Sequence, residues 1–319
     1  MIIFYLRDTQ AAGEVAVKIL ATQDKERYDR AKREMNLLNM FYKHKRICTM
    51  IHGTALDAVQ KCICIFQFYE LGTVQTLLDE GHAEFTHRAH DQAPACLRFR
   101  HAVDMAKDVL EGLECMHKMM IVHRDIKPAN ICVEISSSAQ SQSPSTTQLR
   151  FTIIDLGAAV SIEAVTSDPE SVAGAVGFTG QFTSLAGVKV PLGTVLYMSP
   201  EHIDEDRAVD GRSDVFSFGV TMYYCLCGRF PFVQPEAVYD AKRLALKLMG
   251  YYTGPKEAEP LYLGLGVRPR AGEELAAIIT KSLRKLPKDR YHTAHDMKTS
   301  VERIERYRAK YLSLRALLL

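Results

Sequence analysis

The sequence predicts an α+β protein of two lobes, a small one built on a sheet and a larger one built mainly of helices. Before residue 70, short apolar runs rich in β-branched and aromatic residues surround one long amphipathic pattern. After residue 70, helical patterns predominate. The length of 319 residues suits one large bilobal domain or two ordinary domains.

The small lobe is expected to contain strands around a single helix. Residues 2–6 and 14–20 are apolar runs separated by a polar turn, which is typical of neighbouring strands. Residues 24–44 carry apolar positions at spacings of three and four, so they predict an amphipathic helix. Residues 61–69 are apolar on both faces and predict a buried strand. The apolar stripe of the helix consists of Ala31, Met35, Leu38 and Phe41.

The large lobe is expected to be mostly helical. Residues 101–118 repeat the helical spacing, and residues 215–228 are apolar all round, as in a buried helix. Two stretches interrupt this pattern and predict loops, namely the polar residues 136–148 and the small-residue segment 161–190.

These elements predict the organisation of the whole chain. We expect a small lobe over residues 1–70, a large lobe over residues 71–308 and a helical tail over residues 309–319.

Composition argues against several classes of protein. The net charge is +2, from 40 basic and 38 acidic residues, which gives no support for nucleic-acid binding. No apolar run approaches the roughly 20 residues that span a bilayer. The eight cysteines form no CxxC pair and indicate buried free thiols in a reducing compartment. We therefore expect an intracellular protein, cytoplasmic in the first instance, with the nucleus left open.

Lys18 is a charged residue within an apolar strand pattern. A lone lysine of this kind is usually a strand-end residue that extends its ammonium to water. Glu34, however, lies at the edge of the apolar stripe of the predicted helix, where it can face the strand and pair with Lys18. An ammonium held in this way suits the oxygens of a polyphosphate.

The stretch IVHRDIKPAN at residues 121–130 concentrates polar chemistry after an apolar run. Asp125 and Lys127 are followed by Asn130, and Asp155 follows a later strand with Gly157 two residues on. Amide and carboxylate oxygens are ligands that Mg²⁺ accepts, so Asn130 and Asp155 are candidate metal ligands. Asp125 is a candidate base. These are the parts needed to transfer a phosphoryl group to a hydroxyl.

With these motifs in order, the chain resembles the eukaryotic protein kinases over nearly its whole length. Each match alone is weak, but an ordered series is specific. The matching segments are VAVK (15–18), Glu34, HRDIKPAN (123–130), DLG (155–157), GTVLYMSPE (193–201), SDVFSFGV (213–220) and LPKDR (286–290).

The resemblance implies catalytic roles for these positions. Lys18 would hold the α- and β-phosphates of ATP and pair with Glu34. Asp125 would orient the substrate hydroxyl and accept its proton, and Lys127 would contact the γ-phosphate. The implied Mg²⁺ ligands are Asn130 and Asp155.

The resemblance also implies an adenine pocket. Residues 66–73 are similar to the segment that links the two lobes of a kinase, with Phe66 at the gatekeeper position. Ala16 and Cys132 would enclose the adenine ring. The backbone facing adenine would be that of Gln67, Phe68 and Tyr69.

Two details resemble serine/threonine kinases rather than tyrosine kinases. Lys127 stands two residues after Asp125, and Thr194 could bridge these two side chains. The implied partners are proteins with serine or threonine acceptors. Arg124 implies control by a phosphate in the 157–200 segment, added by an upstream kinase or by autophosphorylation. Candidate acceptors there are Thr179, Thr183 and Ser184.

Further positions have implied structural roles. Glu201 and Arg290 resemble the buried ion pair beneath the peptide-binding surface of kinases, and Asp214 would hold the catalytic loop from below. His123 and Leu156 resemble members of a stacked apolar spine that includes Leu38.

The sequence departs from the family at its beginning. Only 17 residues precede Lys18, and the glycine-rich loop that covers the phosphates in kinases has no counterpart. We favour an N-terminally truncated kinase, because the later catalytic positions are intact. The alternative is a pseudokinase or scaffold with weak or no catalysis. A small-molecule phosphotransferase is less consistent with the segment GTVLYMSPE.

Overall fold

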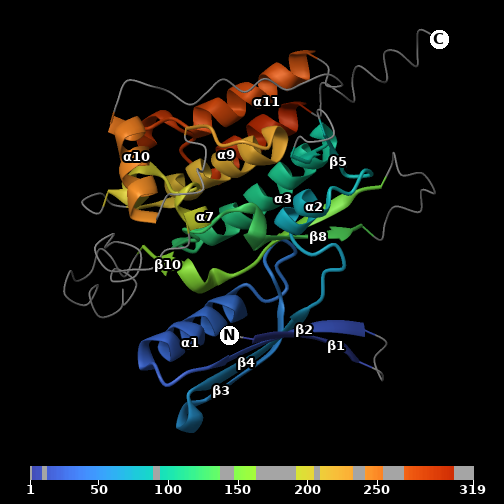
Figure 1. Cartoon of the computed structure of the whole chain (residues 1–319), viewed down its shortest axis with the longest axis vertical. Helices are drawn as coiled ribbons and strands as arrows, with labels where there is room; N and C mark the ends of the chain where they lie inside the picture. Colours follow the sequence, from blue (N-terminus) through green and yellow to red (C-terminus); the bar gives the residue numbers. More distant parts are fainter. Residues whose placement is uncertain are drawn as a thin grey trace.

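The computed structural model describes residues 2–8, 13–88, 94–136, 147–162, 192–204, 209–232, 241–253 and 269–304. In these residues, a small lobe with one sheet and one long helix lies against a larger, mainly helical lobe (Figure 1). The prediction of a two-lobed α+β fold is confirmed. The division proposed at residue 70 lies between β4 (Lys61–Gln67) and α2 (Val74–Glu80), and the proposed tail at 309–319 is outside the described residues.

The small-lobe sheet is antiparallel, with strand order β1-β2-β4-β3. β1 (Ile2–Asp8) and β2 (Gly13–Ala21) were predicted, whereas β3 (Met50–Leu56) was not. The strand pattern of β3 is weak because Gly53 interrupts it and Ile51 is 56% exposed. In the sheet register, Lys18 lies opposite Cys64 and Ala16 lies opposite Phe66.

The helix α1 (Lys25–Met40) covers one face of this sheet (Figure 1). It begins after Asp24, whose carboxylate accepts hydrogen bonds from the Glu26 and Arg27 backbone N–H groups. It ends at Met40 rather than at the predicted residue 44. Its buried Met35 and Leu38 belong to one apolar cluster with Cys62, Cys64 and the partly buried Leu20 and Phe66. This packing turns Glu34 towards Lys18.

The large lobe is organised around two long helices, α3 (Phe99–Lys118) and α9 (Gly211–Cys227), which contact each other. α9 is buried on all sides, as its sequence predicted, and α11 (Pro269–Ser282) packs against it. α9 and α11 approach closely at Gly219 of α9, where an added Cβ would lie 2.0 Å from Ser282 Oγ of α11. α3 also contacts β9 (Leu149–Ile153), which pairs with β8 (Ile131–Ile135) at the boundary between the lobes.

Shorter elements complete the described part of the large lobe. They are β5 (Thr86–His87), β6 (Cys96–Leu97), β7 (Ile121–Val122), β10 (Val160–Ser161), α7 (Leu192–Val195), α8 (Pro200–Ile203), α10 (Ala241–Thr253) and a helical stretch at 294–304.

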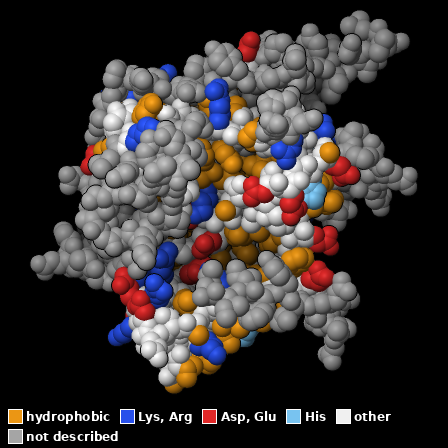
Figure 2. Space-filling model, in the orientation of Figure 1, with side chains coloured by type: hydrophobic (Ala, Val, Ile, Leu, Met, Phe, Trp, Pro, Cys, Tyr) orange, Lys and Arg blue, Asp and Glu red, His pale blue; other side chains and the backbone are white. Residues whose placement is uncertain are grey.

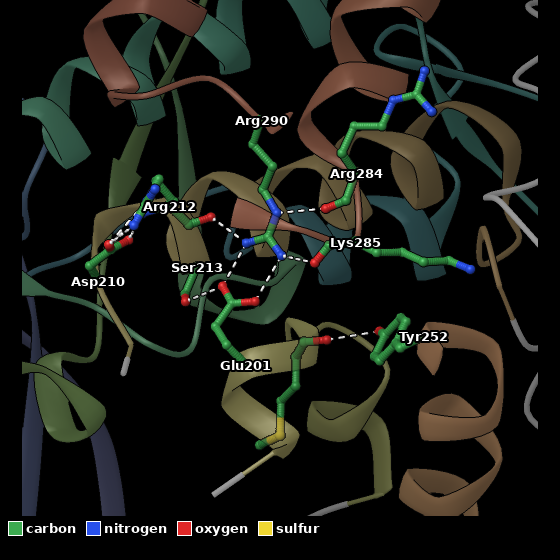
Figure 3. Close-up of polar contacts among 9 residues, drawn as sticks. Glu201, Asp210, Arg212, Ser213, Tyr252, Arg284, Lys285 and Arg290 are labelled. Atoms are coloured by element: carbon green, nitrogen blue, oxygen red, sulfur yellow. Dashed lines mark hydrogen bonds and ion pairs between the residues drawn. The ribbon is translucent and has the colours of Figure 1, made fainter. Parts of the chain in front are cut away.

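A buried ion pair joins α8 to the segment after α11 (Figure 3). Arg290 Nη1 and Nη2 donate to the two Glu201 carboxylate oxygens at 2.6 and 2.7 Å, and both side chains are at most 2% exposed. Ser213 Oγ donates to the same carboxylate at 2.6 Å. The guanidinium also lies 4.8 Å from the ring centroid of Phe216. The pair predicted from the sequence is thus formed, and it fixes α8 on the helical core.

Two observations bear on the environment of the protein. All eight cysteines are free thiols, and six of them are buried. Among the described helices, none has both the length and the apolar character needed to cross a membrane.

Replacing Arg290 by leucine should destabilise the fold strongly. The substitution leaves the Glu201 carboxylate buried without its cation, which costs about 3–5 kcal/mol. Urea unfolding of the variant and of the parent protein measures the difference. The matched control is Lys288→Leu at a nearby exposed position, where a change within about 0.5 kcal/mol is expected. A loss below about 1 kcal/mol for Arg290→Leu would contradict the importance of the pair.

Candidate active site

A cleft of about 610 Å³ lies between the lobes. Figure 2 shows a hollow across the middle of the molecule, where acidic and basic side chains gather beside an apolar wall. The cleft is lined from the small lobe by Lys18 and Glu34 and from the large lobe by Asn130 and Asp155. Residues far apart in the sequence therefore share one space.

Lys18 and Glu34 form an ion pair in the small-lobe wall of the cleft. Lys18 Nζ lies 2.6 and 2.9 Å from the two Glu34 carboxylate oxygens and 4.0 Å from Asp155 Oδ1. Burial by itself would lower the pKa of Lys18, but the Glu34 and Asp155 carboxylates raise it above its ordinary value. The ammonium therefore stays charged at neutral pH, with an anionic residue of each lobe beside it.

Asp155 is held in a left-handed turn directly after β9, with φ of 61°. Aspartate tolerates this conformation better than most residues. Its Oδ1 accepts a hydrogen bond from the Gly157 backbone N–H at 3.2 Å, and the intervening Leu156 is buried in the small-lobe cluster. Although burial alone would raise the pKa of Asp155, the Lys18 ammonium and the Gly157 N–H hold it below its ordinary value. The carboxylate is thus anionic and anchored.

The loop after β7 groups the remaining polar side chains. Lys127 Nζ donates to both Asp125 carboxylate oxygens at 2.9 and 2.8 Å. Asn130 Nδ2 donates to the Asp125 backbone oxygen at 2.8 Å and to Oδ2 at 2.9 Å. Because the amide nitrogen is used in this way, the Asn130 oxygen is left for a ligand. Burial raises the pKa of Asp125, an effect that the Lys127 ammonium partly offsets.

Asp125 does not itself line the cleft; it lies one hydrogen bond beyond Asn130. The predicted bridge by Thr194 takes a different form. Lys127 Nζ donates to Thr194 Oγ1 at 2.9 Å, so the lysine spans the aspartate and the threonine. An ammonium has three donors, so Lys127 can donate to both Asp125 carboxylate oxygens and to Thr194 Oγ1.

The loop backbone is held from below by Asp214, which is fully buried on α9. Its carboxylate accepts hydrogen bonds from the His123 and Arg124 backbone N–H groups at 2.9 and 2.8 Å, and from His117 Nε2 at 2.8 Å. Burial alone would raise its pKa, but these donors lower it. Arg124 has a φ of 68°, so the carboxylate stabilises a left-handed residue directly before Asp125.

The apolar end of the cleft contains the residues expected around adenine. Ala16 and Cys132 line it, as do Phe66, Gln67, Phe68 and Tyr69. Tyr69 is 9% exposed and packs with Cys48 and Cys132, and its backbone oxygen accepts from the Gly72 N–H at 2.9 Å. Burial raises the pKa of the Cys132 thiol to about 12, so the thiol stays neutral.

Three contributing residues were missed by sequence reasoning. Arg30 Nε donates to the Gly157 backbone oxygen at 3.0 Å, and its only sequence signal is its place one turn before Glu34. His117 lies in the last turn of α3 and donates a hydrogen bond to Asp214. His202 accepts from Arg124. Nothing in the local sequence pattern marks the two histidines, because their partners are distant along the chain.

The candidate metal ligands fit Mg²⁺. One anionic carboxylate and one amide oxygen suit an ion that keeps several waters and also binds phosphate oxygens. In the described ranges, no group of three or more His, Cys, Asp or Glu side chains could hold a metal ion by itself.

The fold and the site together have the arrangement of a protein kinase domain. The family model described as protein kinase domain matches residues 3–301, so the chain belongs to the protein kinase family.

Its relatives include bacterial proteins named as serine/threonine kinases. Serine/threonine-protein kinase PknB of Mycobacterium leprae is 30% identical over 203 residues, which is 64% of this chain and 26% of the relative. A probable serine/threonine-protein kinase of Streptomyces coelicolor is 26% identical over 307 residues, 94% of this chain and 37% of the relative. Serine/threonine-protein kinase pkn2 of Myxococcus xanthus is 36% identical over 134 residues, 42% of this chain and 13% of the relative. The chain therefore corresponds to a minor part of each.

Replacing Asp214 by asparagine should destabilise the protein by about 1–3 kcal/mol. The new amide has one acceptor oxygen where the carboxylate had two, and its NH₂ group would face backbone N–H donors. Urea unfolding measures the loss. The exposed Asp289→Asn substitution is the control, with little change expected. Equal stability of Asp214→Asn and the parent would show that the loop does not need this carboxylate.

Proposed function

We propose that the chain is a protein serine/threonine kinase domain that transfers the γ-phosphoryl group of ATP to serine or threonine hydroxyls of proteins. One observation carries this proposal. Lys18, Asn130 and Asp155 line the same cleft, and Asp125 is hydrogen-bonded to Asn130. The printed names of the relatives support the same activity, although the chain spans only 26% of the length of the PknB relative.

The proposed nucleotide site has a polar and an apolar half. Ala16 and Cys132 would enclose the adenine ring, beside the backbone of Gln67 to Tyr69. Lys18, kept charged and positioned by Glu34, would hold phosphate oxygens. Asn130 and Asp155 would hold Mg²⁺, which when bound neutralises charge on the phosphates.

Asp125 would receive the substrate hydroxyl. Its carboxylate would accept a hydrogen bond from that group and take its proton as the new oxygen–phosphorus bond forms and the bond from the γ-phosphorus to the departing ADP oxygen breaks. Lys127 would stabilise negative charge on the transferring group and remain anchored to Thr194. Because phosphoryl transfer needs positioning and charge neutralisation more than covalent help, the fixed contacts around Asp125 support this role.

The alternative of a non-catalytic scaffold receives less support. A chain that only binds partners has no need of the Lys18–Glu34 pair and the Asp125–Lys127–Asn130 group in one assembly.

The cellular location is also a proposal. The free, mostly buried thiols support an intracellular, cytoplasmic location. Phosphorylation in the 157–200 segment stays a sequence-based prediction, since its candidate acceptors Thr179, Thr183 and Ser184 lie outside the described residues.

Asp125→Asn should lower kcat by about 100-fold to 10,000-fold, because the amide cannot accept the proton. ATP affinity, measured by calorimetry with Mg²⁺, should stay within about threefold. Radiolabel transfer to generic serine and threonine substrates measures the rate, and Asp289→Asn is the matched control. Transfer at the parent rate would remove Asp125 from the mechanism.

Lys18→Met should reduce transfer by at least about 100-fold while the protein remains folded. The thioether preserves packing but leaves Glu34 and the phosphates without a cation. Transfer, nucleotide affinity and circular dichroism are compared with those of Lys25→Met, an exposed control on α1. Unchanged turnover would mean that Lys18 is only structural.

A further inference from the structure

The guanidinium of Arg124 contacts the imidazole of His202 inside the large lobe. Arg124 Nε and Nη2 lie 3.4 and 3.3 Å from His202 Nε2, and the two residues are 7% and 3% exposed. Arg124 directly precedes Asp125, while His202 belongs to α8 and directly follows Glu201. The contact therefore joins the loop that carries Asp125 to the short helix held by the Arg290–Glu201 pair.

The geometry defines the protonation state of His202. A guanidinium has donors only, so His202 Nε2 must present its lone pair and the ring proton must be on Nδ1. Burial, reinforced by the Arg124 charge, lowers the pKa of His202 to about 3, although the Asp214 and Glu201 carboxylates act in the opposite direction. At neutral pH the imidazole is thus an uncharged acceptor.

Arg124 needs such an acceptor. Its side chain is buried, and a buried cation is costly unless hydrogen bonds compensate it. Its backbone is in the left-handed region, and its N–H is bound by Asp214. Asp214 thus holds the main chain of Arg124, and His202 holds its side chain. Both contacts therefore hold Arg124, the residue directly before Asp125.

We propose that His202 is a positioning residue that holds the catalytic loop through Arg124, and that this neutral partner replaces the phosphate expected to meet Arg124. A phosphate could engage the same guanidinium edge only by displacing His202. The inference rests on the proposed kinase function for its effect on turnover, but the contact itself can be tested without activity.

The first experiment measures the contact directly in the full chain. A double-mutant cycle in urea unfolding combines His202→Leu with Arg124→Met. We expect the two substitutions to be coupled by about tenfold or more in the unfolding equilibrium constant. In ¹⁵N-histidine-labelled protein at pH 7, His202 should give the neutral Nδ1–H tautomer, assigned by loss of its signal in His202→Gln. Absence of coupling, or a protonated or Nε2–H ring, would overturn the proposal.

The second experiment measures turnover after phosphatase treatment, with complete dephosphorylation confirmed by mass spectrometry. His202→Leu should lower kcat by about 10-fold to 100-fold while the KM for ATP stays within about threefold. His202→Gln should recover most of the rate, because its amide oxygen can replace Nε2 as the acceptor. His52→Leu, at an exposed position on β3, should match the parent.

The outcomes separate this proposal from the proposed function. If the dephosphorylated parent loses more than about tenfold in kcat relative to its phosphorylated form, a phosphate performs the role and the proposal is wrong. The same follows if His202→Leu retains full activity, or if His202→Gln is no better than His202→Leu. A parent protein that transfers no phosphate in either form would refute the kinase function, while the cycle and the spectrum would still decide the role of His202.

Discussion

The ion pair between Lys18 and Glu34 is the contact on which the candidate site depends. A lysine whose side chain is only 22% exposed is unfavourable unless an anion compensates it, so the position of α1 and the charge of Lys18 require each other. Apolar packing of Met35 and Leu38 against the sheet brings the helix to the right distance. Once formed, the pair keeps an ammonium 4.0 Å from Asp155 and so connects the small lobe electrostatically to the large one.

The large lobe contributes the loop that carries Asp125, and hydrogen bonds from its backbone to Asp214 on α9 hold its conformation. Arg124 and Asp155 are both left-handed, and each is stabilised by a specific carboxylate–amide contact rather than by regular secondary structure. Asp214 extends from the most buried helix of the lobe, and Glu201 is held by Arg290 near the start of that helix. The carboxylates of Asp214 and Glu201, which hold the loop and α8, are therefore attached to the apolar core, and this restricts their movement.

Much of this arrangement was predictable from local sequence. The strands β2, β4 and β9 and the helices α3 and α9 have strong apolar patterns, and they occur close to the predicted positions. β3 was missed because three of its seven residues are exposed and Gly53 weakens the pattern. The C-terminal end of α1 was placed too far along the chain, since Phe41 continues the apolar stripe although it lies just beyond the last helical turn.

The sequence by itself determined the lobes, the order of the motifs and the chemical identity of Lys18, Asp125, Asn130 and Asp155, because periodicity and residue type are local properties. Only the tertiary structure decided which groups meet. It made Lys127, rather than Thr194, the bridging residue, and it gave Arg124 a neutral partner in His202. Lys127 and Thr194 are separated by 67 positions in the sequence, and Arg124 and His202 by 78. Such contacts depend on how whole elements pack, and no local pattern encodes that packing.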